Sequence, residues 1–171
     1  MTSGHGGVLL DDARGLMGSE DLREHTFAVR AAHESGTAAW PGVDLSLEDF
    51  ARHVKARVAT EDAIDVLMRH GDDLFLACAC ARGDRRAVEL FSQNFLGAVP
   101  VIVARIVPHA LIEELVQSLH EVMLVRRDGS PPHIAEYRGT GSLAGWVRIS
   151  ATRAAVRMKN RAARLDRKSV V

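Results

Sequence analysis

Apolar residues recur at helical spacing between positions 110 and 125, and this regularity is the strongest in the chain. On a helix that turns by about 100° per residue, the apolar side chains fall on one arc and the polar ones on the opposite arc. The apolar set is Leu111, Ile112, Leu115, Val116, Leu119, Val122 and Met123, and the polar set is Glu113, Glu114, Gln117 and Glu121. The spacing predicts an amphipathic helix with a carboxylate-bearing face.

Start and stop signals predict further helices on both sides of this segment. Ser46, Asp84 and Ser142 stand where N-caps are expected, because their side-chain oxygens can accept a hydrogen bond from the first turn of a helix. Gly71 is expected to end a short helix over residues 61–70. No segment alternates apolar and polar residues as a strand would. We therefore expect an all-α fold, a compact bundle of five or more helices.

Residues 126–141 contain three glycines and two prolines, which predicts a loop. The helix that follows is expected to run to about residue 165.

Composition excludes several classes of protein. With 47% hydrophobic and 26% charged residues, the chain has the profile of a folded soluble domain. Its longest apolar stretch, residues 99–107, is too short to span a membrane, and residues 1–10 lack the pattern of a signal peptide. Cys78 and Cys80 are the only cysteines. We expect two buried thiols in a reducing cytoplasm, with a redox pair or metal clip as the alternative.

A formal net charge of zero conceals a strong polarity. Residues 1–145 carry 14 Lys and Arg against 21 Asp and Glu, whereas residues 146–171 carry 8 against 1. In a helix, one stripe of this last segment collects Trp146, Arg153, Arg157, Arg161, Arg164 and Lys168, and a separate arc collects Val147, Ala151, Ala154, Met158 and Leu165. The second arc is expected to face the core.

Unpaired cations at this spacing repel one another, and a polyanion removes the repulsion. The cationic stripe therefore indicates nucleic-acid binding, a solvated helix end, or contact with an acidic protein or membrane surface. The acidic face over residues 110–125 is either solvated or a docking surface for a basic partner.

Nothing in the sequence indicates catalysis. The eight histidines form no metal-binding or triad pattern, and the glycines of residues 138–142 lack the strand and the G-K-[ST] of a phosphate loop. We expect no enzyme, no metal and no cofactor.

Three motifs, taken in order, resemble region 2 of the extracytoplasmic-function (ECF) sigma factors of RNA polymerase. The first is Ala81-Arg82-Gly83-Asp84 followed by residues 87–91, and the second is E-E-L-V-Q at residues 113–117, against E-D-L-V-Q in the family. The third is Y-R-G-T-G-S-L-A-G-W-V-R-I at residues 137–149. The resemblance spans residues 72–165, more than half of the chain.

The resemblance implies a transcription initiation factor. It implies that the acidic helix docks on the clamp helices of the largest subunit of core RNA polymerase, through Glu113, Glu114, Gln117 and Glu121. It implies that the loop and the last helix recognise and melt the −10 element of promoter DNA and hold an extruded base. The DNA-binding residues would be Tyr137, Arg138, Gly139, Thr140, Ser142, Trp146, Arg148, Arg153, Arg157 and Arg161. Base extrusion costs a few kcal/mol, which a pocket with stacking offsets.

The chain departs from the family at Thr152, where Asn is frequent, and at Ser118, where an acidic residue is customary. An anti-sigma protein is a further partner that the resemblance implies. The alternative function is an interaction module of the same fold that binds polymerase or an anti-sigma protein without recognising a promoter.

We expect three parts: a weakly ordered N-terminal arm over residues 1–45 with one helix at most, a helical extension over 46–71, and the region 2-like domain over 72–171. Acidic residues in the first two parts make them a candidate cover for the cationic stripe.

Overall fold

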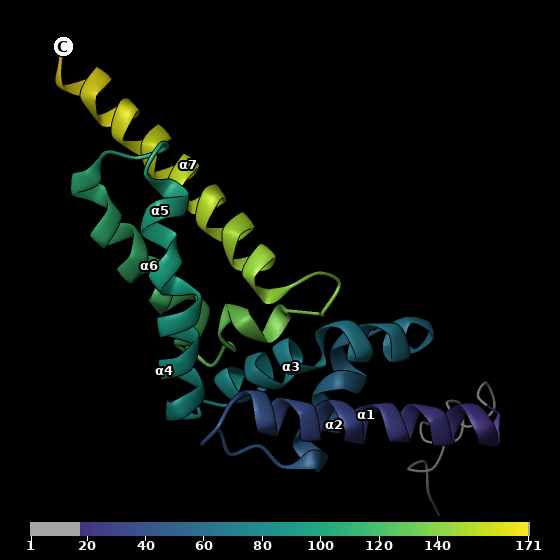
Figure 1. Ribbon diagram of the computed structural model, residues 1–171. Coiled ribbons are helices and arrows are strands. Elements are labelled where there is room, and N and C mark those ends of the chain that lie inside the picture. The colour runs from purple at the N-terminus through teal and green to yellow at the C-terminus, as the bar shows by residue number, and fades with distance from the viewer. Residues whose placement is uncertain (1–17, 171) are drawn as a thin grey trace, which may run out of the picture.

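The computed structural model describes residues 18–170, and these form seven α-helices (Figure 1). Four of the six connections contain a short 3-10 turn. The only strand-like contact in residues 18–170 is an isolated bridge between Arg127 and Ser130. The prediction of an all-α fold is confirmed. The helices are α1 (Ser19–Ala39), α2 (Leu47–Arg57), α3 (Ala63–Ala81), α4 (Arg85–Asn94), α5 (Val99–Val103), α6 (Ile112–Leu124) and α7 (Leu143–Ser169).

The three expected N-caps are confirmed. The side-chain oxygens of Ser46, Asp84 and Ser142 each accept a hydrogen bond from the backbone N–H three residues further on, at 3.1, 2.7 and 3.1 Å. Gly83 follows α3 with a φ of +85°, a conformation that costs glycine little. Short-range signals therefore set the starts of α2, α4 and α7.

The helices are arranged along an elongated molecule. Figure 1 shows α1, α2 and α3 together at one end and α5, α6 and α7 at the other, with α4 between them. We call α1–α3, residues 19–81, the N-terminal layer. One continuous hydrophobic cluster joins the two ends, and residues 74–80 of α3 are all buried in it. Because α3 also packs against α4 and the 3-10 turn His133–Glu136, it is the central helix of the fold.

Helix α1 crosses α3 at two glycines. A Cβ placed on Gly36 would lie 2.4 Å from Cγ of Phe75, and one on Gly71 would lie 2.8 Å from Cβ of Ala32. Only hydrogen fits at these points, so the glycines let the two backbones approach closely. The crossing is also held by the Trp40 indole, which donates to the backbone carbonyl of Asp72 at 3.0 Å.

The one helix that the expected N-terminal arm could carry is α1, and it is long, covering residues 19–39; residues 1–17 lie outside the described range. The periodicity is weak there because Val29, Ala32 and Gly36 are the only buried residues of α1, and two of them are small. Packing on α3 stabilises this helix more than its own amphipathicity does.

Helix α3 runs through the expected stop at Gly71 but bends there. His70 has non-helical dihedrals (φ −134°, ψ 23°), so the short predicted helix and the next one are continuous across a kink. The expected boundary between residues 71 and 72 falls inside α3, one residue past the kink.

Both cysteines are buried in α3, as expected. Burial raises the pKa of the Cys78 and Cys80 thiols to about 12, so both are protonated and unreactive at neutral pH. Among the described helices, none combines the length and the apolar character needed to cross a membrane.

Candidate nucleic-acid interface

Helix α7 separates a packed side from a cationic side, as the sequence predicts. Val147, Ala151 and Met158 are buried against the body, and α5 and α6 supply most of that contact. The cations Arg148, Arg153, Arg157, Arg161, Arg164 and Lys168 are all exposed. Within residues 18–170, none of these six forms an ion pair. Their positive charge is therefore available to an external anion.

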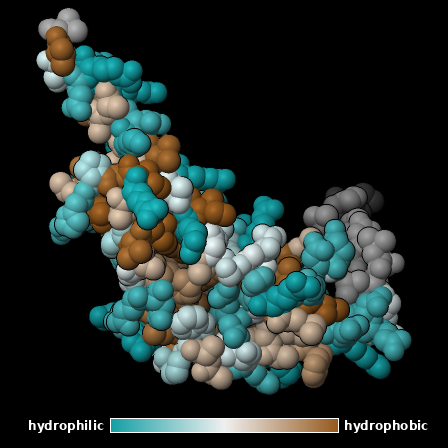
Figure 2. All heavy atoms as spheres, turned by 45° about the horizontal axis from the view of Figure 1, so that its top comes forward, coloured by the Kyte–Doolittle hydropathy of each residue, from teal (hydrophilic) through white to brown (hydrophobic). Residues whose placement is uncertain are grey.

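The last turns of α7 extend past the body. After Met158 no residue up to position 170 is buried, and Leu165 is 61% exposed. The expectation that Leu165 faces the core is therefore wrong, because the last buried residue, Met158, lies about two turns earlier. Figure 2 shows mostly hydrophilic side chains over this projecting end. Just below it, apolar and hydrophilic side chains are mixed. We call residues 159–169 the α7 tip.

The start of α7 is fixed by a residue on α3. The backbone N–H of Leu143 donates to Oδ2 of Asp73 at 2.8 Å, a contact between residues seventy positions apart. A carboxylate at this point also interacts favourably with the helix macrodipole. Asp73 therefore orients α7 relative to the N-terminal layer.

The glycine-containing loop, residues 137–142, lies on the same part of α3. Gly139 has a φ of +70°, and a Cβ on it would lie 2.7 Å from Cγ1 of Val66. The Tyr137 hydroxyl donates to the carbonyl of Gly141 across the loop. Burial, with the nearby Asp73 carboxylate, raises the pKa of Tyr137. The loop is held in one conformation by packing and by its own hydrogen bond.

Two of the predicted DNA contacts are not on the surface. Tyr137 is only 2% exposed and Gly139 is buried, so neither is presented to a strand in this structure, and their roles as direct contacts stay predictions. Both hold the loop in place. The sequence does not reveal this burial, because the burial of Tyr137 depends on α3, far away in the sequence. Arg138, Thr140 and Ser142 are exposed on the loop, as expected.

An aromatic pair that the sequence did not reveal lies beside the loop. The ring of His133 stacks on Trp146, with centroids 4.9 Å apart and planes at 28°, and Tyr137 meets Trp146 edge-on at 6.0 Å. Nδ1 of His133 lies 2.9 Å from a carboxylate oxygen of Glu136. Trp146 and His133 are both partly exposed. The stacked pair is therefore the aromatic surface nearest the loop, and no local pattern links its two members.

The carboxylate-bearing face of α6 is exposed where it was expected. Glu113, Glu114 and Gln117 are solvent-exposed, while Leu115 and Leu119 are buried beneath them. Glu121 is half-buried and pairs with Arg127 of the next loop, so its charge is partly neutralised. The face available to a basic partner is therefore formed by Glu113, Glu114 and Gln117.

The described residues contain no group of three or more side chains placed to hold a metal ion. Two grooves of the described residues border α1 in the N-terminal layer, and neither includes a predicted site residue. The candidate interface on α7 is formed by exposed, charged side chains.

Comparisons of the chain with protein-family models, with curated proteins and with solved structures find no match.

Proposed function

We propose that the chain is a sigma-type transcription initiation factor, similar to region 2 of the ECF sigma factors, that binds core RNA polymerase and −10 promoter DNA. The observation that carries this proposal is the row of exposed, unpaired cations on α7, directly after the loop bearing the third sigma-like motif. Release of counterions from phosphates would supply affinity along the row.

Within the DNA site, we assign the roles according to the exposure of each residue. Strand contact falls to Arg138, Thr140 and Ser142 on the loop and to Arg148, Arg153, Arg157 and Arg161 on α7. Stacking on an unpaired base falls to the exposed parts of Trp146 and His133. Tyr137 and Gly139 become positioning residues. Because Asp73 and Val66 hold the loop and the start of α7, this surface is organised before DNA arrives, which lowers the entropic cost of binding.

The polymerase contact is proposed for the exposed face of α6. Glu113, Glu114 and Gln117 would meet basic side chains of the largest-subunit clamp helices, with Glu121 contributing less because Arg127 already pairs with it. The surfaces on α6 and α7 belong to helices that pack against each other, so one rigid unit would bring polymerase and DNA together. We place the protein in the cytoplasm, where both partners are found.

A second function is favoured by the burial of Tyr137. If strand capture required that ring, the chain would instead be an interaction module that binds polymerase or an anti-sigma protein without recognising a promoter.

Run-off transcription separates the two functions. The full chain, fused to a −35-binding domain, is added to core polymerase on a promoter template. A sigma factor yields a transcript that depends on the −10 sequence. An interaction module that binds polymerase co-purifies with it and yields no transcript. Failure to co-purify would refute both polymerase-binding functions and leave only a module that binds an anti-sigma protein.

A further inference from the structure

The N-terminal layer does not cover the cations of α7. Helices α1 and α2 pack against α3 and against each other, and Figure 1 shows them at the end of the molecule opposite the α7 tip. The described part of the acidic N-terminal region is thus a separate surface rather than an intramolecular cover.

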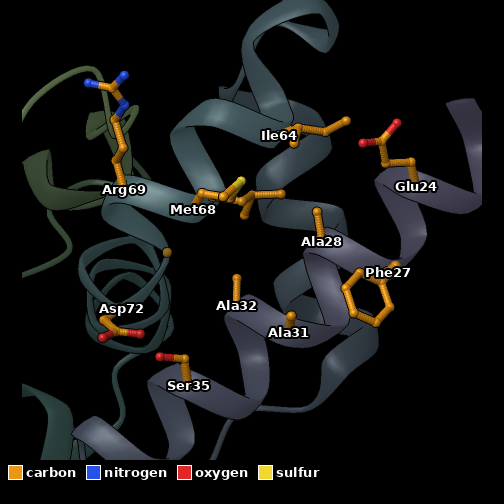
Figure 3. Close-up of a pocket in the computed structure, with 12 residues that line it drawn as sticks. Glu24, Phe27, Ala28, Ala31, Ala32, Ser35, Ile64, Met68, Arg69 and Asp72 are labelled. Atoms are coloured by element: carbon orange, nitrogen blue, oxygen red, sulfur yellow. The ribbon is translucent and has the colours of Figure 1, made fainter.

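This surface contains a groove of about 470 Å³ between α1 and the first half of α3. Its floor is formed by small side chains of α1, including Ala28, Ala31 and Ala32, together with Leu67. Figure 3 shows Met68 and Ile64 of α3 and Phe27 of α1 around it. Phe27 is 72% exposed and Met68 is 80% exposed. Large apolar side chains this exposed at one groove indicate an interaction surface.

The charge around the groove is negative. Residues 18–81 contain 12 Asp and Glu against 6 Lys and Arg, and Glu24 and Asp72 both line the groove. Arg69 also lines the groove, but its guanidinium pairs with Asp65 at 2.8 Å, which partly neutralises its charge. The occupant that fits is an apolar side chain flanked by basic ones.

The α7 tip has this chemistry. Residues 159–170 carry five Lys and Arg against one Asp, with the exposed Leu165 among them. At 1.5 Å per residue the tip extends about 16 Å, and it points away from the groove of its own chain. The tip can therefore reach only the groove of another molecule, not the groove of its own chain.

We propose that two copies of the chain associate head to tail, with the α7 tip of one inserting Leu165 into the α1–α3 groove of the next. The chain's net charge of zero removes the long-range repulsion between copies that would oppose this contact. Because the contact joins two different surfaces, it propagates into rings or open chains rather than stopping at a symmetric pair.

The contact has a regulatory consequence, which rests on the proposed function. Arg161 and Arg164 lie on the tip, so association removes part of the cationic row from DNA. Free nucleic acid would then compete with the groove for the α7 tip. At high protein concentration part of the DNA-binding surface would be buried in the assembly, and dilution would expose it.

Sedimentation velocity of the full chain over a range of concentrations tests the proposal at about 50 and 500 mM salt. The sedimentation coefficient should rise with concentration at low salt and much less at high salt, since screening weakens the charge complementarity. A monomer at every concentration in low salt overturns the proposal.

Substitutions locate the contact. Leu165→Gln and Met68→Gln are each expected to raise the dissociation constant about tenfold, because each removes apolar area buried only in the assembly. Val101→Gln is the matched control, since Val101 is 83% exposed on α5 and belongs to neither the groove nor the α7 tip. If Val101→Gln weakens association as much as the other two, the assigned surfaces are wrong.

A peptide of residues 157–170, added in excess, should dissociate the assemblies, whereas a scrambled peptide of the same composition should not. Equal effects of the two peptides would reduce the contact to charge alone and refute insertion of Leu165. These experiments contain no polymerase or DNA. A failure of the association proposal therefore leaves the proposed function untouched, and a failure of the proposed function leaves the association results valid.

Discussion

Asp73 and Leu143 are linked by a hydrogen bond of 2.8 Å from the Leu143 backbone N–H to the Asp73 carboxylate. This bond joins α3, the central helix, to the first turn of α7, which carries the cations. Through this bond the N-terminal layer helps to set the direction of the candidate DNA-binding surface.

Replacing Asp73 should weaken both the fold and the surface. Asp73→Ala leaves the Leu143 N–H without its acceptor and removes a negative charge from the helix N-terminus, at a cost of about 1–2 kcal/mol. Asp73→Asn keeps an acceptor oxygen, so its free energy of unfolding should fall by less than that of Asp73→Ala. Urea unfolding followed by circular dichroism measures the two variants, and equal loss in both would show that hydrogen bonding at this site contributes nothing.

The glycines at the α1–α3 crossing should tolerate no side chain. Gly36→Ala brings a methyl group to 2.4 Å from the Phe75 ring, and the required shift should cost about 1–3 kcal/mol despite a better helix propensity. Gly97→Ala is the matched control, because its nearest neighbour would be 3.9 Å away. Thermal unfolding compares them. A destabilisation of Gly97→Ala equal to that of Gly36→Ala would contradict a specific role for the crossing.

These examples show which parts of the fold the sequence predicts. Ser46, Asp84 and Ser142 are recognisable because a cap and its partner lie three residues apart. The periodicity over 110–125 is equally local, and α6 follows it closely, although Val122 is 51% exposed because no neighbour covers that edge. Glu113, Glu114 and Gln117 are exposed because the apolar residues between them turn the opposite side of α6 towards the body.

The parts that could not be predicted depend on distant contacts. Gly36 and Gly71 look like helix-weakening residues until α1 and α3 are placed together. Tyr137 looks like a surface aromatic in a loop, and only packing against α3 buries it. The stacking of His133 on Trp146 joins a loop to a helix with no periodic relationship between the two.

Stability should fall in mild acid because of His53. Its ring is largely buried, Nε2 has no hydrogen-bond partner within residues 18–170, and burial, with the nearby positive charge of Arg57, lowers the pKa to about 4. The unfolded chain, with a pKa near 6.5 at this residue, therefore binds the proton more readily than the folded chain. The stability contributed by neutral His53 is present above pH 6.5 and is lost as the pH falls to about 4.

The expected loss over this interval is roughly 1–3 kcal/mol. Urea unfolding at a series of pH values measures it, and His53→Leu should flatten the slope between pH 6.5 and 4. His109→Leu is the control, since His109 is exposed in the turn that precedes α6. An unchanged slope in His53→Leu would mean that other groups cause the acid sensitivity.

The polymerase contact should depend on the charge of α6. Glu113→Arg combined with Glu114→Arg reverses two exposed charges without touching the buried Leu115, so helicity should persist while co-purification with core polymerase is lost. Glu34→Arg combined with Glu48→Arg makes the same change in charge on the N-terminal layer and should leave co-purification intact. Normal recovery of polymerase with the α6 variant would refute the docking assignment.

The central claim is that the cations of α7 bind the non-template strand of a −10 element, and fluorescence anisotropy with such an oligonucleotide at two salt concentrations tests it most directly. We expect a negative salt slope, about tenfold weaker binding when Arg153 and Arg157 are both changed to Gln, and a slope shallower by about 1.4 for that variant, because each lost phosphate contact on a single strand removes about 0.7. Arg52→Gln combined with Arg69→Gln, on the N-terminal layer, should bind as the original chain does. Absence of binding at low salt, or equal loss in both double variants, would contradict the account.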